Sequence, residues 1–241
     1  SVNESVESNK KWFPFQKGGS YRKWYGNNEY VLNWQNDGEE IKKREFKPTL
    51  RNIDYFFQKA ITWTYITTKP LNVRVSNENF TYSGVGGGIF EIAENEYIFL
   101  LSVMNSKVHP YLIDLMGGAT MTYESGDIAK LPVILPKQES TKQQIDILTQ
   151  ESIDISKEEW DSRETSWDFT KNGLLKHNND DKIETAYNNY CSYWKKKFYK
   201  LHANEEELNR LFIDIYELSD ELTPDVDLKD ITILKSESII N

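Results

Sequence analysis

The sequence has 241 residues, a formal net charge of −9 at neutral pH and 28% charged residues, an ordinary composition for a chain that can bury a sizeable core. One cysteine excludes an internal disulfide, and no apolar run approaches the roughly 20 residues that span a bilayer. We therefore expect a cytoplasmic protein with no membrane segment. Because the chain starts with Ser1 and not with methionine, we also expect a piece of a longer protein.

Charge is distributed unevenly along the chain. Residues 10–75 hold thirteen lysines and arginines against six acidic residues, a surplus of +7, whereas the residues after 75 carry −14. A basic front part is typical of a surface that binds phosphates, and an acidic back part suits a different partner. The alternative is a chance asymmetry over a solvated surface.

Residues 17–34, KGGSYRKWYGNNEYVLNW, combine glycines, two adjacent cations, aromatic rings and amides in a short span. A glycine pair and a Gly-Asn-Asn group predict turns, because glycine and asparagine tolerate positive φ. Alternating apolar residues predict a strand over 30–34. We expect an exposed turn at a sheet edge, a surface suited to a polyanion. The alternative is a hairpin whose aromatic residues are core, with Trp24 anchoring the turn.

The next stretch predicts a turn, a helical turn and two strands. Residues 36–38, Asn-Asp-Gly, are a strong turn signal, residues 54–66 mix a short helix with a strand, and residues 73–75 form a further strand. Glycines cluster between residues 80 and 92. They lack the GxGxxG spacing and no helix pattern follows them, so we expect a glycine-rich strand connection and no nucleotide loop.

A helix is predicted over residues 96–104, with Asn105 as its stop. Residues 126–136, GDIAKLPVILP, predict a last strand that leaves this part of the chain, since apolar residues are flanked there by prolines. After Pro136 the pattern changes to helices, and the first of them covers residues 141–149.

Three further helices are predicted from caps and apolar faces. Ser156 with Glu159 forms a capping box that opens one, and Asp180 caps the next. Asn204 with Glu207 begins the last, which Pro224 ends. Leucines and an isoleucine step along it by three and four, as in a coiled coil. We expect this seam over 208–222 to pack antiparallel on the face over 187–198, because the link at 202–204 is short.

Catalytic motifs are weak in this chain. Asp37, Glu40 and Lys42 imitate a nuclease metal site, but they fall in a predicted turn. The three histidines are far apart and lack ligand spacing. We therefore predict no catalytic residue and no metal site, and we expect His109 to be a surface residue or a satisfied structural one and not a general base.

Several segments carry a family resemblance. KKWFPFQKGGSYRKWYGNNEYVLNWQNDGEEIKK resembles the start of the target-recognition region of BREX-type (PglX-like) phage-defence adenine methyltransferases, and is similar to that of restriction-associated adenine methyltransferases. Residues 104–107, MNSK, and the GDI and LP of residues 126–132 resemble the end of that region, where a helix begins with LNSK-like residues. EELNRLFIDIYELSDELTPDVDLKDITI resembles the helical segment after it. The resemblance covers most of residues 11–234.

This resemblance implies an α+β (or α/β) fold, with a mixed-sheet target-recognition domain over 10–136 and a helical spacer over 137–241. It also implies DNA sequence recognition for an adenine-N6 methyltransferase. Such enzymes need an S-adenosylmethionine loop and an Asn-Pro-Pro-aromatic motif, and this chain has no Pro-Pro pair. S-adenosylmethionine is then the cofactor of the parent enzyme and its N-terminal methyltransferase domain, and this fragment alone holds no cofactor and transfers no methyl group.

Double-stranded DNA is the expected partner, with phosphate contacts for affinity and base-edge contacts for specificity. Asparagine pairs bidentately with adenine, and lysine and arginine bind phosphates. The candidate DNA-binding residues supply cations, amides or stacking rings: Arg22, Lys23, Trp24, Tyr25, Asn27, Asn28, Lys42, Lys43, Arg44, Arg51, Lys69 and Arg74.

Two other hypotheses remain. In the first, the chain is a protein-interaction module whose acidic helical half docks the methyltransferase domain or another defence subunit. In the second, it is a generic binder of an aromatic-stacking ligand, which the resemblance disfavours. Salt dependence separates DNA binding from apolar docking, because DNA affinity falls steeply with salt.

Overall fold

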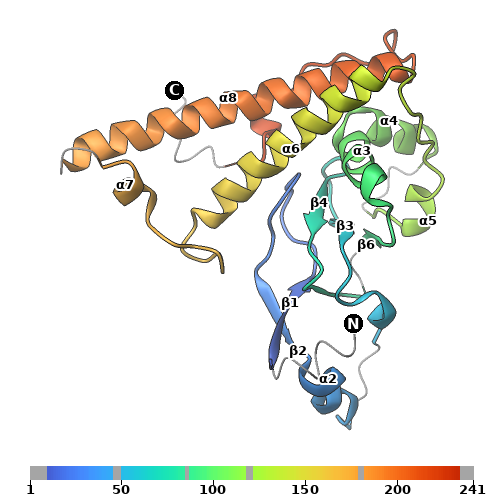
Figure 1. Ribbon diagram of the computed structural model, residues 1–241. Coiled ribbons are helices and arrows are strands. Elements are labelled where there is room, and N and C mark those ends of the chain that lie inside the picture. The colour runs from blue at the N-terminus through green and yellow to red at the C-terminus, as the bar shows by residue number, and fades with distance from the viewer. Residues whose placement is uncertain (1–9, 46–49, 85–86, 118–121, 179–181, 234–241) are drawn as a thin grey trace.

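The computed structural model describes residues 10–45, 50–84, 87–117, 122–178 and 182–233. Within these ranges the strands lie in the front part of the chain, and the two longest helices lie in the back part (Figure 1). The fold class is α+β, as the sequence predicts. Over the same ranges, none of the helices combines the length and apolar character needed to cross a bilayer.

The first sheet has the strand order β2-β1-β5. Its central strand β1 (Trp12–Gln16) pairs antiparallel with β2 (Tyr30–Asn33) and parallel with the two-residue β5 (Thr81–Tyr82). The strand predicted over 30–34 is thereby confirmed. The helix α2 (Gln35–Lys42) follows at the lower end of Figure 1. Its residues 36–38 all have positive φ, which confirms the predicted turn.

The second sheet has the strand order β4-β3-β6 and is antiparallel throughout. The 3-10 turn η1 (Ile53–Tyr55) leads into β3 (Ala60–Trp63), so the predicted mixture of helix and strand over 54–66 is confirmed. On either side of β3 lie β4 (Val73–Ser76), which was also predicted, and β6 (Gly87–Ile89).

Aromatic rings explain the glycines of β6. A Cβ on Gly87 would overlap the indole of Trp63, and one on Gly88 would lie 2.9 Å from the ring of Phe90. The glycine cluster therefore lets the rings pack against the backbone, and the expected glycine-rich strand connection is confirmed at β6.

Two short helices connect the sheets to the back part. The helix α3 (Glu94–Asn105) ends where its periodicity predicts, and α4 (Val108–Leu115) begins just beyond it. The periodicity and the family pattern thus describe two successive helices.

The strand predicted over residues 126–136 is wrong. Residues Ser125–Ile128 form the short helix α5, and residues 131–136 belong to no strand. Pro132 and Pro136 have no N–H to donate to a sheet. The N–H of Ile134 donates instead to the Tyr216 hydroxyl at 3.1 Å.

Two long helices, α6 (Glu139–Asp161) and α8 (Ile183–Ile215), pack antiparallel across the top of the view in Figure 1. Their pairing is marked by polar contacts from Gln144 to Glu207 at 2.7 Å and from Lys200 to Glu151 at 3.0 Å. The short helix α7 (Gly173–Lys176) packs on the first part of α8, and the 3-10 turn η2 (Leu228–Asp230) precedes the last described residues.

The structure corrects the predicted helix starts. Ser156 and Glu159 are buried inside α6 and open no new helix. Asn204 lies inside the 33-residue α8, where its amide donates to Glu151 Oε2 on α6 at 3.1 Å in place of capping a helix. The antiparallel pair predicted within 187–222 is therefore wrong, since both segments belong largely to one helix. Leu218 and Leu222 lie beyond its end, and Asp180 lies outside the described residues.

The main hydrophobic core contains side chains from both sides of residue 136 in the sequence. It joins side chains of the strands and α3, such as Ile61 and Leu101, to those of α6 and α8, such as Ile145 and Phe198. A second, aromatic core lies under the first sheet and includes Phe13 and Trp34. The two parts predicted over 10–136 and 137–241 thus share a core, and the boundary between them stays a prediction.

Candidate functional site

The segment Arg22–Tyr25 lies between the second sheet and the two long helices. Trp24 forms a parallel bridge with Arg74, in which its N–H donates to Val73 O and its carbonyl accepts from the N–H of Val75, both at 2.9 Å. Arg22, Lys23, Trp24 and Tyr25 are all buried. The exposed cationic turn predicted here is wrong, and the alternative, in which Trp24 anchors the turn to the core, is confirmed.

The Arg22 side chain donates hydrogen bonds to four residues from three parts of the chain. Its guanidinium donates to the carbonyls of Tyr25, Ser156 and Thr232, and its Nη2 lies 2.6 Å from Glu159 Oε2. Burial lowers the pKa of Arg22, and the carboxylate of Glu159 opposes that effect. Four of the five N–H donors of the guanidinium are thus used inside the protein, and the buried group is not presented to a phosphate at the surface.

Trp160 completes this cluster from α6. Its ring is flanked by the guanidinium carbons of Arg22, at 5.0 Å from the ring centroid, and Arg163, at 4.8 Å. Arg163 also reaches Glu159, at 2.8 Å, so one buried carboxylate serves two arginines. Gly26, at φ +124°, makes the approach possible, because a Cβ there would overlap the guanidinium end of Arg22.

Glu205 of α8 provides a second buried carboxylate. Its Oε2 lies 2.7 Å from Lys23 Nζ, and its Oε1 accepts a hydrogen bond from the Trp24 indole at 2.8 Å. Burial lowers the pKa of Lys23, but the Glu205 carboxylate, together with Tyr21 and Asp230, outweighs burial and leaves that pKa above its ordinary value. Lys23 is therefore a charged, paired group of the interior.

Arg74 is fully buried and pairs with no carboxylate among the described residues. Its guanidinium donates to Arg22 O and Asn72 Oδ1, each at 2.9 Å, and to Thr64 Oγ1 at 3.3 Å. Burial lowers the pKa of Arg74 to about 9, and the neighbouring Arg22 adds to the effect. Arg74 thus closes the network from the sheet side.

The two adjacent amides and Tyr25 are also interior. Asn28 Oδ1 accepts from Gln16 at 2.9 Å, and Asn27 Nδ2 donates to the Ser20 carbonyl at 2.9 Å. The ring of Tyr25 lies 5.0 Å from Lys157 Nζ, and burial raises the pKa of its hydroxyl. These three side chains hold the turn together in this structure and do not present their polar groups to solvent.

The other five predicted DNA-binding residues are exposed: Lys42, Lys43, Arg44, Arg51 and Lys69. The first three have acidic partners on the same short segment, Asp37, Glu39 and Glu40. Arg51 packs its aliphatic stem on Gly84, just beyond β5. Lys69 Nζ lies 5.8 Å from the ring centroid of Tyr21.

Two groups of residues were not predicted from the sequence. Glu159 and Glu205, the partners of Arg22 and Lys23, carry no local signal, because 137 and 182 residues separate them from those cations. The second omission is a run from Thr185 to Asn204 that holds four lysines and no acidic residue. That signal is visible in the sequence. No group of metal-ligating side chains occurs within the described ranges.

Comparisons with known proteins give two strong similarities. The chain is 37% identical over 246 aligned residues to the adenine-specific methyltransferase PglX of Lacticaseibacillus casei (strain Zhang), an alignment that covers 98% of this chain and 20% of that protein. It is 34% identical over 224 residues to the adenine-specific methyltransferase BrxX of Escherichia coli O9:H4 (strain HS), covering 92% and 18%. The chain thus spans about a fifth of the length of these curated relatives. No protein-family model matches it.

Proposed function

We propose, from the premise that this chain is homologous to one segment of the adenine-specific methyltransferases PglX and BrxX, that it reads the DNA target for an adenine-N6 methyltransferase of BREX-type phage defence. The observation that carries the proposal is the extent of the alignment. Nearly the whole chain aligns with a fifth of each relative, and the chain lacks the Pro-Pro pair of the adenine-binding motif. A site-specific methyltransferase needs target reading as well as transfer chemistry, and this segment is suited to the former.

The proposed reading surface lies on the first sheet, at the end where β1 and β5 both finish. Lys17 directly follows β1, and its Nζ lies 5.2 Å from the ring centroid of the exposed Tyr30. Arg51 lies at the same end, since it packs on Gly84 and the N–H of Ser83 donates to Gln16 O. Exposed cations beside an exposed ring can contact a phosphate and stack on a base or sugar. Lys69, which lies beside the ring of Tyr21, would extend this surface. The cations of α2 lie at the opposite end of the sheet, because Asn33 at the end of β2 pairs with Trp12 at the start of β1.

A selection experiment tests the proposal. The purified chain is incubated with a library of randomised duplexes, and the bound fraction is sequenced. A target-reading module enriches one motif. Arg51→Ala and Lys69→Ala should each flatten the slope of log affinity against log salt by about one unit and leave the free energy of unfolding within about 0.5 kcal/mol. Arg22→Ala is the contrasting variant, because it removes a buried ion-pair partner and should lower stability. Binding without any enriched motif would contradict the proposal.

S-adenosylmethionine would be held by a part of the parent outside this chain. Gly87 and Gly88 do not form an open cofactor loop, because rings of Trp63 and Phe90 occupy the space beside them. We propose that the isolated chain neither binds S-adenosylmethionine nor methylates DNA. Titration calorimetry with the cofactor tests this, and micromolar binding would contradict it.

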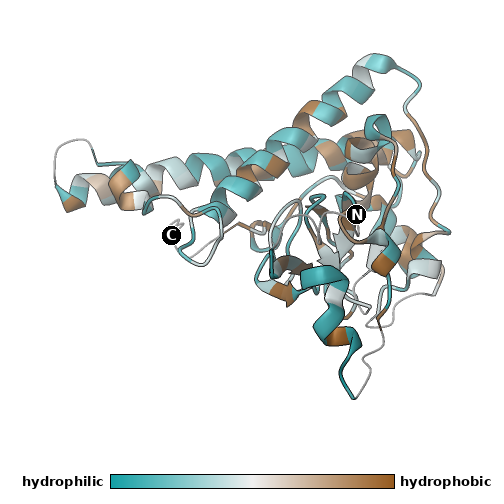
Figure 2. Ribbon diagram, turned by 60° about the horizontal axis from the view of Figure 1, so that its bottom comes forward, coloured by the Kyte–Doolittle hydropathy of each residue, from teal (hydrophilic) through white to brown (hydrophobic). Residues whose placement is uncertain are grey.

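The docking alternative, stated for the acidic helical half, has one supporting observation, which lies just before that half. Val133, Ile134 and Leu135, between the two prolines of the link from α5 to α6, are 43–60% exposed, and this link is brown in Figure 2. An exposed extended apolar segment is a suitable site for another protein. Ile134→Asp should then abolish co-purification with the separately expressed remainder of the parent while the selected DNA motif is retained. Unchanged co-purification would remove this alternative.

A further inference from the structure

Residues 185–204, within α8, form the longest described stretch of the back part without acidic residues. Between Glu184 and Glu205 the chain has four lysines and one histidine, together with five tyrosine and tryptophan residues and three asparagines. The rest of the back part is acidic, so this run reverses the local sign of charge. In Figure 1 this part of α8 extends with α7 away from the sheets.

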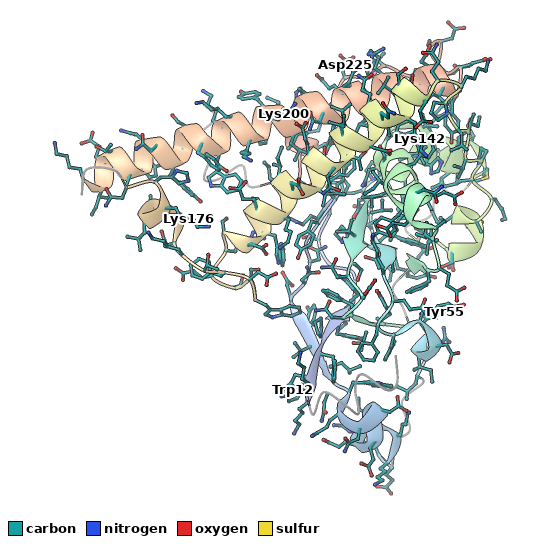
Figure 3. The ribbon with its side chains drawn as sticks, in the orientation of Figure 1. Trp12, Tyr55, Lys142, Lys176, Lys200 and Asp225 are labelled. Carbon is teal, nitrogen blue, oxygen red and sulfur yellow. The ribbon has the colours of Figure 1, made fainter. Side chains whose placement is uncertain are left out.

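Two of the four lysines are used within the protein. Lys197 Nζ lies 3.0 Å from Glu158, and Lys200 Nζ lies 3.0 Å from Glu151, both on α6. Lys195 and Lys196 are exposed, and neither pairs with a carboxylate among the described residues. Figure 3 labels Lys200 along this helix and Lys176 on the neighbouring α7.

Helical spacing places the free lysines on the outer face. Ser192, Lys196 and Tyr199 lie at i, i+4 and i+7, and all three are exposed. Trp194, Phe198 and Leu201 are buried on the opposite side. The outer face over residues 185–199 is about 20 Å long and carries cations, hydroxyls and amides. These are the side chains that donate to phosphate oxygens.

An ordinary solvated face is the competing explanation. In a protein with 38 acidic and 29 basic residues, a solvated face mixes both signs, and the other exposed pairs here do so, as on α2. The run from Thr185 to Asn204 contains no carboxylate, and its Lys195 and Lys196 also lack a carboxylate partner from the other described residues. A polyanion is the ligand whose charge complements these two lysines.

We propose that the outer face of α8 over residues 185–199 binds the sugar-phosphate backbone of duplex DNA, through Lys195 and Lys196. This inference rests on the proposed function and adds a contact that carries no sequence information. We call this face of α8 the arm. The arm would span roughly six base pairs of duplex DNA, and its phosphate contacts would add affinity to the base contacts made by the first sheet.

Fluorescence anisotropy of the full 241-residue chain with a labelled duplex of about 24 base pairs tests the arm over a series of salt concentrations. Lys195→Gln with Lys196→Gln should flatten the salt slope by about two units and lower affinity about tenfold at about 0.1 M salt, equally for every duplex sequence. Lys195→Arg with Lys196→Arg should restore both values. Lys137→Gln with Lys142→Gln, at the other end of the helical part, is the matched control and should change little.

The outcomes separate this inference from the proposed function. Wild-type slope and affinity in the double glutamine variant, or no binding of any duplex by the wild-type chain, would overturn the arm. Loss of binding to phosphatidylserine vesicles in that variant, without loss of DNA binding, would assign the face to a membrane and also overturn it. A flattened slope in a chain that enriches no DNA motif would support the arm and contradict the reading function.

Discussion

The ammonium of Lys23 and the carboxylate of Glu205 lie 2.7 Å apart in the protein interior, although 182 residues separate them along the chain. A cation of the basic front part is thus neutralised by a carboxylate of the acidic back part, and Arg22 with Glu159 repeats the arrangement. Part of the uneven charge distribution along the sequence therefore reflects pairing inside the fold. Only the cations that remain exposed are available to a polyanion.

Removing the Glu205 charge should destabilise the protein strongly. Glu205→Gln leaves the Lys23 ammonium buried without a counter-charge, and breaking a buried pair in this way typically costs about 3–5 kcal/mol. Urea unfolding followed by circular dichroism measures the change. Glu39→Gln, which breaks the exposed pair with Lys43, is the control and should cost at most about 1 kcal/mol. An equal loss of unfolding free energy in the two variants would show that the buried pair contributes no more to stability than the exposed pair.

A methyl group on Gly87 should disrupt the second sheet. Gly87→Ala places a Cβ on top of the Trp63 indole, so the ring must move, and overpacking of this kind costs about 1–3 kcal/mol. Gly126→Ala is the matched control, because no atom lies within 4 Å of a Cβ there. The melting temperature should therefore be lowered by the first change alone. A normal melting temperature for Gly87→Ala would mean that Trp63 does not cover this strand.

Acid should destabilise the protein through His109. The ring is 1% exposed, its Nε2 faces Pro132 O at 3.3 Å, and burial lowers its pKa to about 4. The unfolded chain, with an ordinary pKa near 6.5, takes up the proton first as the pH falls. The stability from the neutral ring is therefore complete above about pH 6.5 and is lost toward about pH 4.

Between about pH 7 and about pH 5 this linkage predicts a loss of about 2 kcal/mol in the free energy of unfolding. Denaturant unfolding at the two pH values measures it. His109→Gln should remove that part of the pH dependence, whereas His177→Gln should retain it. An unchanged pH dependence in His109→Gln would assign the acid sensitivity to other groups.

A proline at residue 203 should distinguish one long helix from a helical pair. Ala203 is exposed within α8, so Ala203→Pro removes a helical hydrogen bond and should cost about 3 kcal/mol or more. Ala203→Gly, the milder control, should cost about 1 kcal/mol. Far-ultraviolet circular dichroism and urea unfolding report both. Tolerance of the proline would favour the helical break that the sequence predicts at 202–204.

Local patterns determined much of the secondary structure. The alternation over 30–34, the Asn-Asp-Gly turn, the strand at 73–75 and the end of α3 at Asn105 all follow from short-range rules, and the structure has each of them. These rules work because backbone preference and side-chain periodicity act over a few residues. They fail where a tertiary contact replaces a local cap, as at Asn204, whose side chain bonds to α6.

The sequence motifs alone were enough to relate this chain to adenine-specific methyltransferases. The lysine run of α8 is also visible in the sequence without the structure. Tertiary structure decided which polar residues face solvent. Arg22 and Arg51 look equivalent as cations in the sequence, yet the first is buried against Glu159 and the second is exposed. The physical reason is that a buried charge needs hydrogen-bond partners or a counter-charge, and the carboxylate that pairs with Arg22 comes from a helix 137 residues away along the chain.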